Sequence, residues 1–325
     1  TKQFMRSKLF TLSTKGTLTL VLLLVTLCGW SQNRTIVLNH SDQKHAATVV
    51  SEKNDGMVIQ FMLNELNLIE VKTSEGKAYL VESQNAPNVL TAGDPDLFYL
   101  TRSIIIPDMG SMELQVIPGK YQEIENIDIA PSKGNLSRNI NPADVPFTKG
   151  AVYQKDAFYP QNLAASREPY IIRDFRGQSI DVYPVQYNPV TKTLRIYSDI
   201  QVIVKYNNKK GVNEFARTRS LNKIESEFGN IYRSMFLNYA QSKYTAVQEE
   251  GELLIICYDN FMDAMKPFVN WKNSIGRKTT LVSKTSVGTT NTAIKTYIAN
   301  YYNNAANDLT YVLLVGDATQ MPTNQ

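Results

Sequence analysis

Two apolar segments of the chain differ in pattern, and this difference decides the fold. Residues Ile200–Tyr206 read Ile-Gln-Val-Ile-Val-Lys-Tyr, whereas residues Leu253–Tyr258 read Leu-Leu-Ile-Ile-Cys-Tyr. The first segment is rich in β-branched residues and alternates with polar side chains, which is typical of a strand with one buried face. The second is apolar throughout, which is typical of a strand in a parallel sheet covered on both faces.

The chain before residue 207 repeats the first pattern. Short apolar runs recur between turn residues, and the turns include Asn188-Pro189 and Asn207-Asn208. The runs are Met57–Leu63, Ser103–Ile106, Met112–Ile117, Ser179–Val185, Thr193–Tyr197 and Ile200–Tyr206. Many short strands at close spacing predict an all-β antiparallel sandwich or barrel. A helix is predicted over 220–240, followed by a polar linker over 241–251.

The chain after Gly251 has the second pattern. A helix is expected over 261–275, with Phe261, Met265, Phe268 and Trp271 as its buried stripe. A short strand over 279–282, a helix over 290–302 and an apolar strand over 309–315 follow. This order predicts an α/β unit with a parallel sheet. Ligands and catalysis lie beyond the carboxyl ends of such strands, where Asp259, Asn260, Asp317 and Thr319 are expected.

Length and charge limit the classes of protein. The 325 residues, of which 43% are hydrophobic, are enough for two domains. The net charge is only +4 and no stretch is dense in Lys or Arg, which excludes nucleic acid as a partner. The chain begins at Thr1 and stops at Gln325 just after an apolar strand, so we expect it to be a fragment of a longer protein.

The N-terminus has the pattern of an export signal. An apolar run over 18–27 is preceded by basic residues and followed by Gly29, Trp30 and Ser31. The basic residues are Lys2, Arg6, Lys8 and Lys15. We expect a signal peptide over 1–31 that is cut between Ser31 and Gln32. An uncleaved membrane anchor is the alternative, although the run is shorter than the ~20 residues of a bilayer span.

Five blocks of the chain resemble gingipain precursors, in the same order and from about residue 55 to the end. The blocks are Ile129–Gly134, Tyr170–Gln178, Asn188–Tyr197, Phe268–Asn273 and Asn307–Asp317. The resemblance implies a β-sandwich prodomain over 32–243, followed over 244–325 by the truncated N-terminal part of a caspase-like α/β cysteine peptidase domain. It further implies a secreted or cell-surface bacterial endopeptidase that cleaves protein substrates after basic residues.

The resemblance also implies a mechanism whose residues lie elsewhere. In the family, a Cys thiolate attacks the scissile carbonyl, a His handles protons, and backbone amides hold the oxyanion. Those His and Cys positions lie beyond Gln325, so this stretch alone is expected to be inactive. Of the candidates present, Cys257 is expected to be a buried core residue and His40 and His45 to be surface residues.

Three positions carry roles implied by the resemblance. Arg138 would act as a substrate-like residue that enters the specificity pocket of the peptidase domain, as a bidentate guanidinium suits a carboxylate. Lys243-Tyr244 aligns with the junction at which the prodomain is cut off. Asp317 aligns with a ligand of a structural calcium ion, and no cofactor is expected for the chemistry itself. Each side chain also has an ordinary structural alternative, namely a solvated arginine, a linker lysine and a turn aspartate.

The expected partners are the protein's own catalytic domain, protein substrates, and the bacterial export and surface-sorting machinery. Two alternatives stay open at this stage. The chain could be a secreted β-sandwich adhesin or binding module with an inactive peptidase-like tail, or a related surface protease that processes sorting signals. The specificity for Arg or Lys, the physiological substrates and the oligomeric state are not determined by the residues present.

Overall fold

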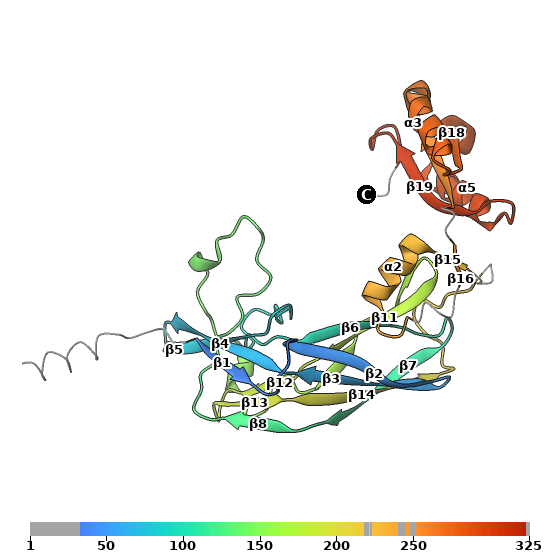
Figure 1. Cartoon of the computed structure of the whole chain (residues 1–325). Coiled ribbons are helices and arrows are strands. Elements are labelled where there is room, and N and C mark those ends of the chain that lie inside the picture. The colour runs from blue at the N-terminus through green and yellow to red at the C-terminus, as the bar shows by residue number, and fades with distance from the viewer. Residues whose placement is uncertain (1–32, 218–220, 222, 240–244, 248–250, 323–325) are drawn as a thin grey trace, which may run out of the picture.

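The computed structural model describes residues 33–217, 221, 223–239, 245–247 and 251–322. The predicted signal peptide, the Ser31–Gln32 bond and Lys243-Tyr244 lie outside the described residues. Figure 1 shows a long β-rich body, the helix α2 (Ser226–Met235) on it, and a smaller α/β unit beyond that helix. Among the described residues, no helix combines the length and apolar character that crossing a bilayer requires.

The β-rich body consists of antiparallel strands in four sheets. One sheet has the order β2-β3-β14-β7, and the others have the orders β1-β4-β5, β12-β13-β8 and β10-β11-β6, with β9 also paired to β11. The strands are β1 (Arg34–Val37), β2 (His45–Lys53), β3 (Gly56–Leu63), β4 (Glu65–Thr73), β5 (Gly76–Glu82), β6 (Leu100–Ile105), β7 (Ser111–Pro118), β8 (Tyr121–Ile124), β9 (Ala164–Ser166), β10 (Tyr170–Ile172), β11 (Phe175–Val182), β12 (Val185–Asn188), β13 (Thr193–Tyr197) and β14 (Asp199–Asn207). Two 3-10 helices, η1 (Pro142–Asp144) and η2 (Ala151–Gln154), lie in the segment between β8 and β9.

The alternating pattern of the sequence produces the core of this body. On β3 the buried side chains are Met57, Ile59, Phe61 and Leu63, two residues apart as the pleat requires. On β14 the same applies to Ile200, Val202 and Val204, and the register places Ile59 opposite Val202 and Phe61 opposite Ile200. All four sheets contribute side chains to one hydrophobic cluster, which is the main core of the body. A second, smaller cluster joins β11 to α2.

The helix α2 is packed on the β-rich body through aromatic side chains. Phe175 of β11 contacts Tyr232 edge-to-face with ring centroids 4.9 Å apart, and the Tyr232 hydroxyl donates to Asp174 at 2.7 Å. After the helix, the backbone of Leu237 donates to Ser103 of β6 at 3.0 Å, which fixes the end of the helix to the sheet.

The region around α2 corrects two predictions. The predicted helix over 220–240 is only 10 residues long and is preceded by a short strand, β15 (Lys223–Glu225). The predicted polar linker contains β16 (Thr245–Val247), which pairs in parallel with β15. Backbone pairing of two three-residue strands leaves no clear apolar pattern in the sequence.

The α/β unit contains a parallel sheet of three strands in the order β18-β17-β19. Its elements are β17 (Glu252–Cys257), the 3-10 helix η4 (Asp259–Phe261), α3 (Met262–Ser274), β18 (Thr279–Ser283), α4 (Lys284–Val287), α5 (Asn291–Asn303) and β19 (Leu309–Val315). The central strand β17 is buried on both faces. Its odd-numbered residues pack with α3 and its even-numbered residues pack with α5. The predicted fold class, an antiparallel β domain followed by a parallel α/β unit, is therefore confirmed.

Two details of the α/β unit differ from the predictions. On α3 the sheet contacts Met262, Met265, Phe268 and Val269, whereas Trp271 is 53% exposed and Phe261 is 39% exposed. The helix begins one residue later than predicted, and its inner face includes Met262 and Val269 instead. The strand β19 is buried only in part, and Val312, Leu313 and Leu314 are exposed. An apolar run identifies a strand, but neighbouring elements decide how much of it is covered.

The two units have separate hydrophobic clusters. The clusters of the β-rich body and α2 draw only on residues up to Tyr239, and those of the α/β unit draw only on residues from Leu253 onward. A unit with its own core has the basic property of an independently folding domain.

Candidate functional site

Arg138 lies in the exposed stretch 137–144 of a loop that projects from the β-rich body, and we call this exposed stretch the tip of the loop. We call residues 133–149 the projecting loop; it is the green segment that rises from the sheets in Figure 1. Arg138 is exposed and occupies a turn that is closed by a hydrogen bond from the Ile140 amide to the Ser137 carbonyl at 2.9 Å. The exposed position at the tip makes the guanidinium accessible to a partner protein.

The base of the projecting loop is held by backbone hydrogen bonds to one segment of the body. The Gly93 amide donates to Ser132 at 2.9 Å on one side, and the Gly150 amide donates to Gly93 at 2.8 Å on the other. Gly93 has φ +85°, and a Cβ there would lie 3.1 Å from the Cα and N of Gly150. Because the chains approach so closely, glycine is required at this crossing. The two ends of the loop are thus fixed while its tip is exposed.

The carboxyl edge of the parallel sheet carries Asp259 and Asp317, as predicted from the strand order. Asp259 accepts from the Thr285 hydroxyl at 2.8 Å, and this hydrogen bond holds the pKa of the carboxyl below its usual value. Asp317 Oδ1 accepts from the Thr319 hydroxyl at 2.6 Å and from the Thr319 amide at 2.8 Å, and its pKa is lowered for the same reason. Both carboxylates therefore order the turns that follow the strands.

The described residues do not form a calcium site around Asp317. Calcium takes about six to eight oxygen ligands, and the described part of the chain contains no group of three His, Cys, Asp or Glu side chains placed to hold a metal ion. One oxygen of Asp317 is already occupied by hydrogen bonds within its own turn. The calcium role of Asp317 stays a prediction.

Cys257 is a core residue, as expected. It is fully buried at the end of β17, and burial raises the pKa of its thiol. A thiol in such surroundings is inert, because the thiolate is the nucleophile. His45 lies at the start of β2 in the other unit, where its Nε2 is 2.9 Å from the Gln84 carbonyl oxygen, and His40 is exposed in the same region.

The contact of β15 and α2 with the α/β unit was not predicted. Glu225 accepts a hydrogen bond from the Thr310 hydroxyl of β19, and its Oε1 lies 3.4 Å from Nη2 of Arg173. Phe228 of α2 stacks near Tyr311 with centroids 5.9 Å apart, and the Arg277 guanidinium lies 4.6 Å from the Tyr311 ring centroid. These residues come from distant parts of the chain and share no motif, so no sequence signal could have joined them.

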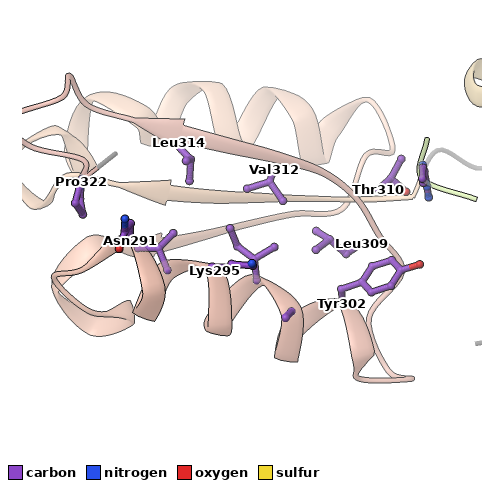
Figure 2. Close-up of a pocket in the computed structure, with 12 residues that line it drawn as sticks. Asn291, Lys295, Tyr302, Leu309, Thr310, Val312, Leu314 and Pro322 are labelled. Carbon is purple, nitrogen blue, oxygen red and sulfur yellow. The ribbon is translucent and has the colours of Figure 1, made fainter. Parts of the chain in front are cut away.

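A cleft of about 650 Å³ lies between α5 and β19. Figure 2 shows Asn291, Lys295 and Tyr302 of α5 facing Leu309, Val312 and Leu314 of β19 across it. Its lining is mainly apolar, and Arg173 of the β-rich body lies at its border. The cleft exists because β19 is only partly covered.

The fold defines a two-unit protein, in which an antiparallel β body precedes a parallel α/β unit. Residues 39–245 match the family model Propeptide_C25, and residues 246–325 match the model of Peptidase family C25. The chain therefore belongs to the gingipain family of C25 peptidase precursors.

Individual relatives agree with this assignment. The chain is 37% identical over 268 residues to Gingipain R2 of Porphyromonas gingivalis, a match that covers 81% of this chain and 36% of that protein. It is 24% identical over 315 residues to Lys-gingipain HG66 of the same species, covering 92% of this chain and 18% of that protein. The chain thus spans little more than a third, or less, of the length of these relatives.

A solved structure is similar as well. The complex of the pro- and mature domains of Porphyromonas gingivalis RgpB contains a chain that matches with 36% identity and a TM-score of 0.55. The match covers 60% of this chain and 98% of that chain.

Proposed function

We propose that this chain is the N-terminal part of the zymogen of an exported cysteine endopeptidase that cleaves after basic residues. Residues 32–243 act as a prodomain that inhibits the enzyme during export and assists its folding. The observation that carries the proposal is Arg138, exposed at the tip of a loop whose two ends are fixed to the body. The family membership of both halves of the chain supports it.

Inhibition follows from the chemistry of Arg138. An enzyme that cleaves after a basic residue needs a carboxylate in its specificity pocket, and the planar guanidinium binds a carboxylate with two parallel hydrogen bonds. The neighbouring Ser137 and Asn139 are small and polar, so they do not prevent the tip from entering a pocket. The bound loop occupies the place of a substrate.

Assistance in folding follows from the topology of the α/β unit. Its strands pair in parallel, and β17 pairs with β19 more than 50 residues later in the chain. Non-local pairing of this kind is slow to form. The β-rich body carries its own core. It can offer Glu225 of β15 and Phe228 of α2 as a surface on which the α/β unit assembles.

Maturation requires cuts at two places. The signal peptide is removed between Ser31 and Gln32, and the prodomain is separated at Lys243-Tyr244. The polar sequence around Lys243 is of the kind that proteases nick. The enzyme is exported to the medium or the cell surface. Asp317 would contribute one ligand to a structural calcium ion whose other ligands lie further along a longer chain.

The test is titration of an active gingipain-type enzyme with the purified prodomain, residues 32–243. We expect inhibition at micromolar concentration or below. Arg138→Ala should weaken inhibition at least about 30-fold, because truncating one partner of a buried charge pair costs about 2–5 kcal/mol. Arg34→Ala, which removes an exposed arginine from β1, is the matched control and should have no effect. Absence of inhibition by the wild-type prodomain would overturn the inhibitory role, and equal inhibition by Arg138→Ala would overturn the placement of this residue.

A further inference from the structure

A lysine connects the two arms of the projecting loop. Lys133 Nζ donates a hydrogen bond to the Pro142 carbonyl at 2.7 Å. The same ammonium group lies 4.2 Å from the centroid of the Phe147 ring. The hydrogen bond encloses residues 134–141, and Arg138 lies near the middle of this short segment. The backbone bonds at the base enclose a longer segment, so Lys133 forms a second closure nearer the tip.

The far attachment point of Lys133 is itself rigid. Pro142 begins η1, where its ring fixes φ. The side chain of Asn141 caps this helix by accepting from the Ala143 amide at 3.1 Å. The Phe147 ring is half-buried at the foot of the loop. Because both contacts of the Lys133 ammonium group, Pro142 and Phe147, belong to ordered parts of the loop, these contacts restrict the movement of the tip.

The near end of the closure is fixed as well. Gly134 has φ +82°, and a Cβ there would lie 3.0 Å from the Cβ of Ala92. Its amide donates to the Ser132 hydroxyl at 3.2 Å. The backbone on either side of Lys133 is thus held against the segment that carries Gly93, and the lysine side chain starts from a defined position.

We propose that Lys133 is a positioning residue that braces the tip of the projecting loop in the conformation in which Arg138 is presented to the peptidase. The inference rests on the proposed function of Arg138. A loop ordered before binding loses less conformational entropy when it binds, so it binds more tightly. A braced loop also resists the local distortion that a protease needs for cleavage after Arg138.

The experiment uses the prodomain of residues 32–243, which contains both hydrophobic clusters of the body. Lys133→Met keeps the apolar stem and removes the charge and the donor. It should weaken inhibition about 5-fold, as expected for the loss of one hydrogen bond. Lys133→Arg keeps a donor and a cation over Phe147 and should restore inhibition. Lys209→Met, which removes an exposed lysine that pairs with Glu113 at 2.8 Å, is the matched control.

Two readouts separate bracing from a general effect on folding. In the Arg138→Ala background, Lys133→Met should cause no further loss of inhibition, because the lysine acts through the arginine. Trypsin should cut the free prodomain after Arg138 about 5-fold faster in Lys133→Met than in wild type, at an unchanged thermal midpoint. Mass spectrometry of the Arg138–Asn139 cut distinguishes it from cleavage at lysines.

The outcomes distinguish this proposal from the proposed function. If the wild-type prodomain does not inhibit, the proposed function fails, and the trypsin rates alone decide whether Lys133 braces the loop. Equal trypsin rates in wild type and Lys133→Met overturn the bracing. The bracing is also overturned if Lys133→Met weakens inhibition by the same factor in the wild-type prodomain and in the Arg138→Ala variant.

Discussion

The β-rich body and the α/β unit cover their apolar side chains in different ways. In the body, all four sheets contribute to one cluster, and β3 and β14 pair with their buried residues directly opposite each other. In the α/β unit only β17 is covered on both faces, while Val312, Leu313 and Leu314 of β19 are exposed. Antiparallel strands with one buried face close a core between them, even when they are distant in the chain like β3 and β14, whereas a parallel strand also needs helices on both faces. The predictions below measure how independent the two units are.

The largest expected effect tests the independence of the body. Phe61→Ala removes a side chain that is 1% exposed in the centre of the body. It should lower the free energy of unfolding of the body by about 3–5 kcal/mol through the cavity it leaves. Hydrogen exchange with mass spectrometry, read in peptides of each unit during urea unfolding, checks this. Protection of β17 should change much less.

A control shows whether burial is the cause. Val50→Ala on β2 removes a side chain that is 60% exposed and should change the stability of the body by less than about 0.5 kcal/mol. An equal loss of protection in both units after Phe61→Ala would mean that the chain unfolds as one body.

The second-largest expected effect concerns the stability of the α/β unit, which depends on the buried carboxylate of Glu252. Burial opposes the ionisation of Glu252, but hydrogen bonds from Thr280, Tyr301 and Lys278 outweigh it, and the pKa lies below its ordinary value. The stabilisation from these bonds is present above the ordinary Glu pKa of about 4.3 and is lost as pH falls through the lower pKa of the folded state. Glu252→Gln should cost the unit about 1–3 kcal/mol at pH 7.

Measurement of unfolding at pH 7 and pH 3 checks the carboxylate prediction. The difference between wild type and Glu252→Gln should shrink at the lower pH, because the stabilisation that comes from the lowered folded-state pKa of Glu252 declines below the ordinary Glu pKa. In the body, burial raises the pKa of Asp96, which gives the opposite sign: its contribution is present below the ordinary Asp pKa and is lost as pH rises through the higher folded-state pKa. Acidification should thus weaken the α/β unit before the region of Asp96.

The third effect tests the contact between the units. Glu225→Gln keeps the shape of the side chain but removes the charge that faces Arg173 and accepts from Thr310. We expect a cost of about 1 kcal/mol, seen as faster hydrogen exchange in α2 and β19 with little change in β3. Glu113→Gln, which removes an exposed carboxylate in the body, is the control. No change in the exchange of β19 would show that this contact does not couple the units.

The smallest expected effect tests whether Trp271 of α3 is buried, as its spacing in the sequence predicted, or exposed, as in the structure. A buried tryptophan in the predicted stripe would cost about 3–5 kcal/mol on truncation to alanine. Because Trp271 is 53% exposed and lies beside Phe268 and Lys272, Trp271→Ala should cost only about 1 kcal/mol. Thermal unfolding of the α/β unit decides between the two values.

The sequence predicted the elements whose patterns are local. The strands Thr193–Tyr197 and Leu309–Val315 have the bounds that were predicted, and the two predicted helices of the α/β unit, α3 and α5, differ by about one residue at their ends, whereas the short helix α4 was not predicted. The predicted strand over 179–185 is divided between β11 and β12 at Tyr183-Pro184, because proline has no backbone N–H to continue the strand pairing. Arg138 was found only through its resemblance to a family, as an arginine between polar residues has no distinctive pattern.

By itself, the sequence determined the change from strands with alternating apolar residues to strands that are apolar throughout. Successive side chains of a strand point to opposite faces, so the order of residues along the strand decides whether one face or both are apolar. The tertiary structure decided which strands meet in the core of the body, the exposure of Trp271 and β19, and the meeting of Glu225 with Thr310. It also decided that Gly93 and Gly150 hold the loop that Lys133 closes. These features depend on residues far apart in the chain, and only close packing brings such residues into contact.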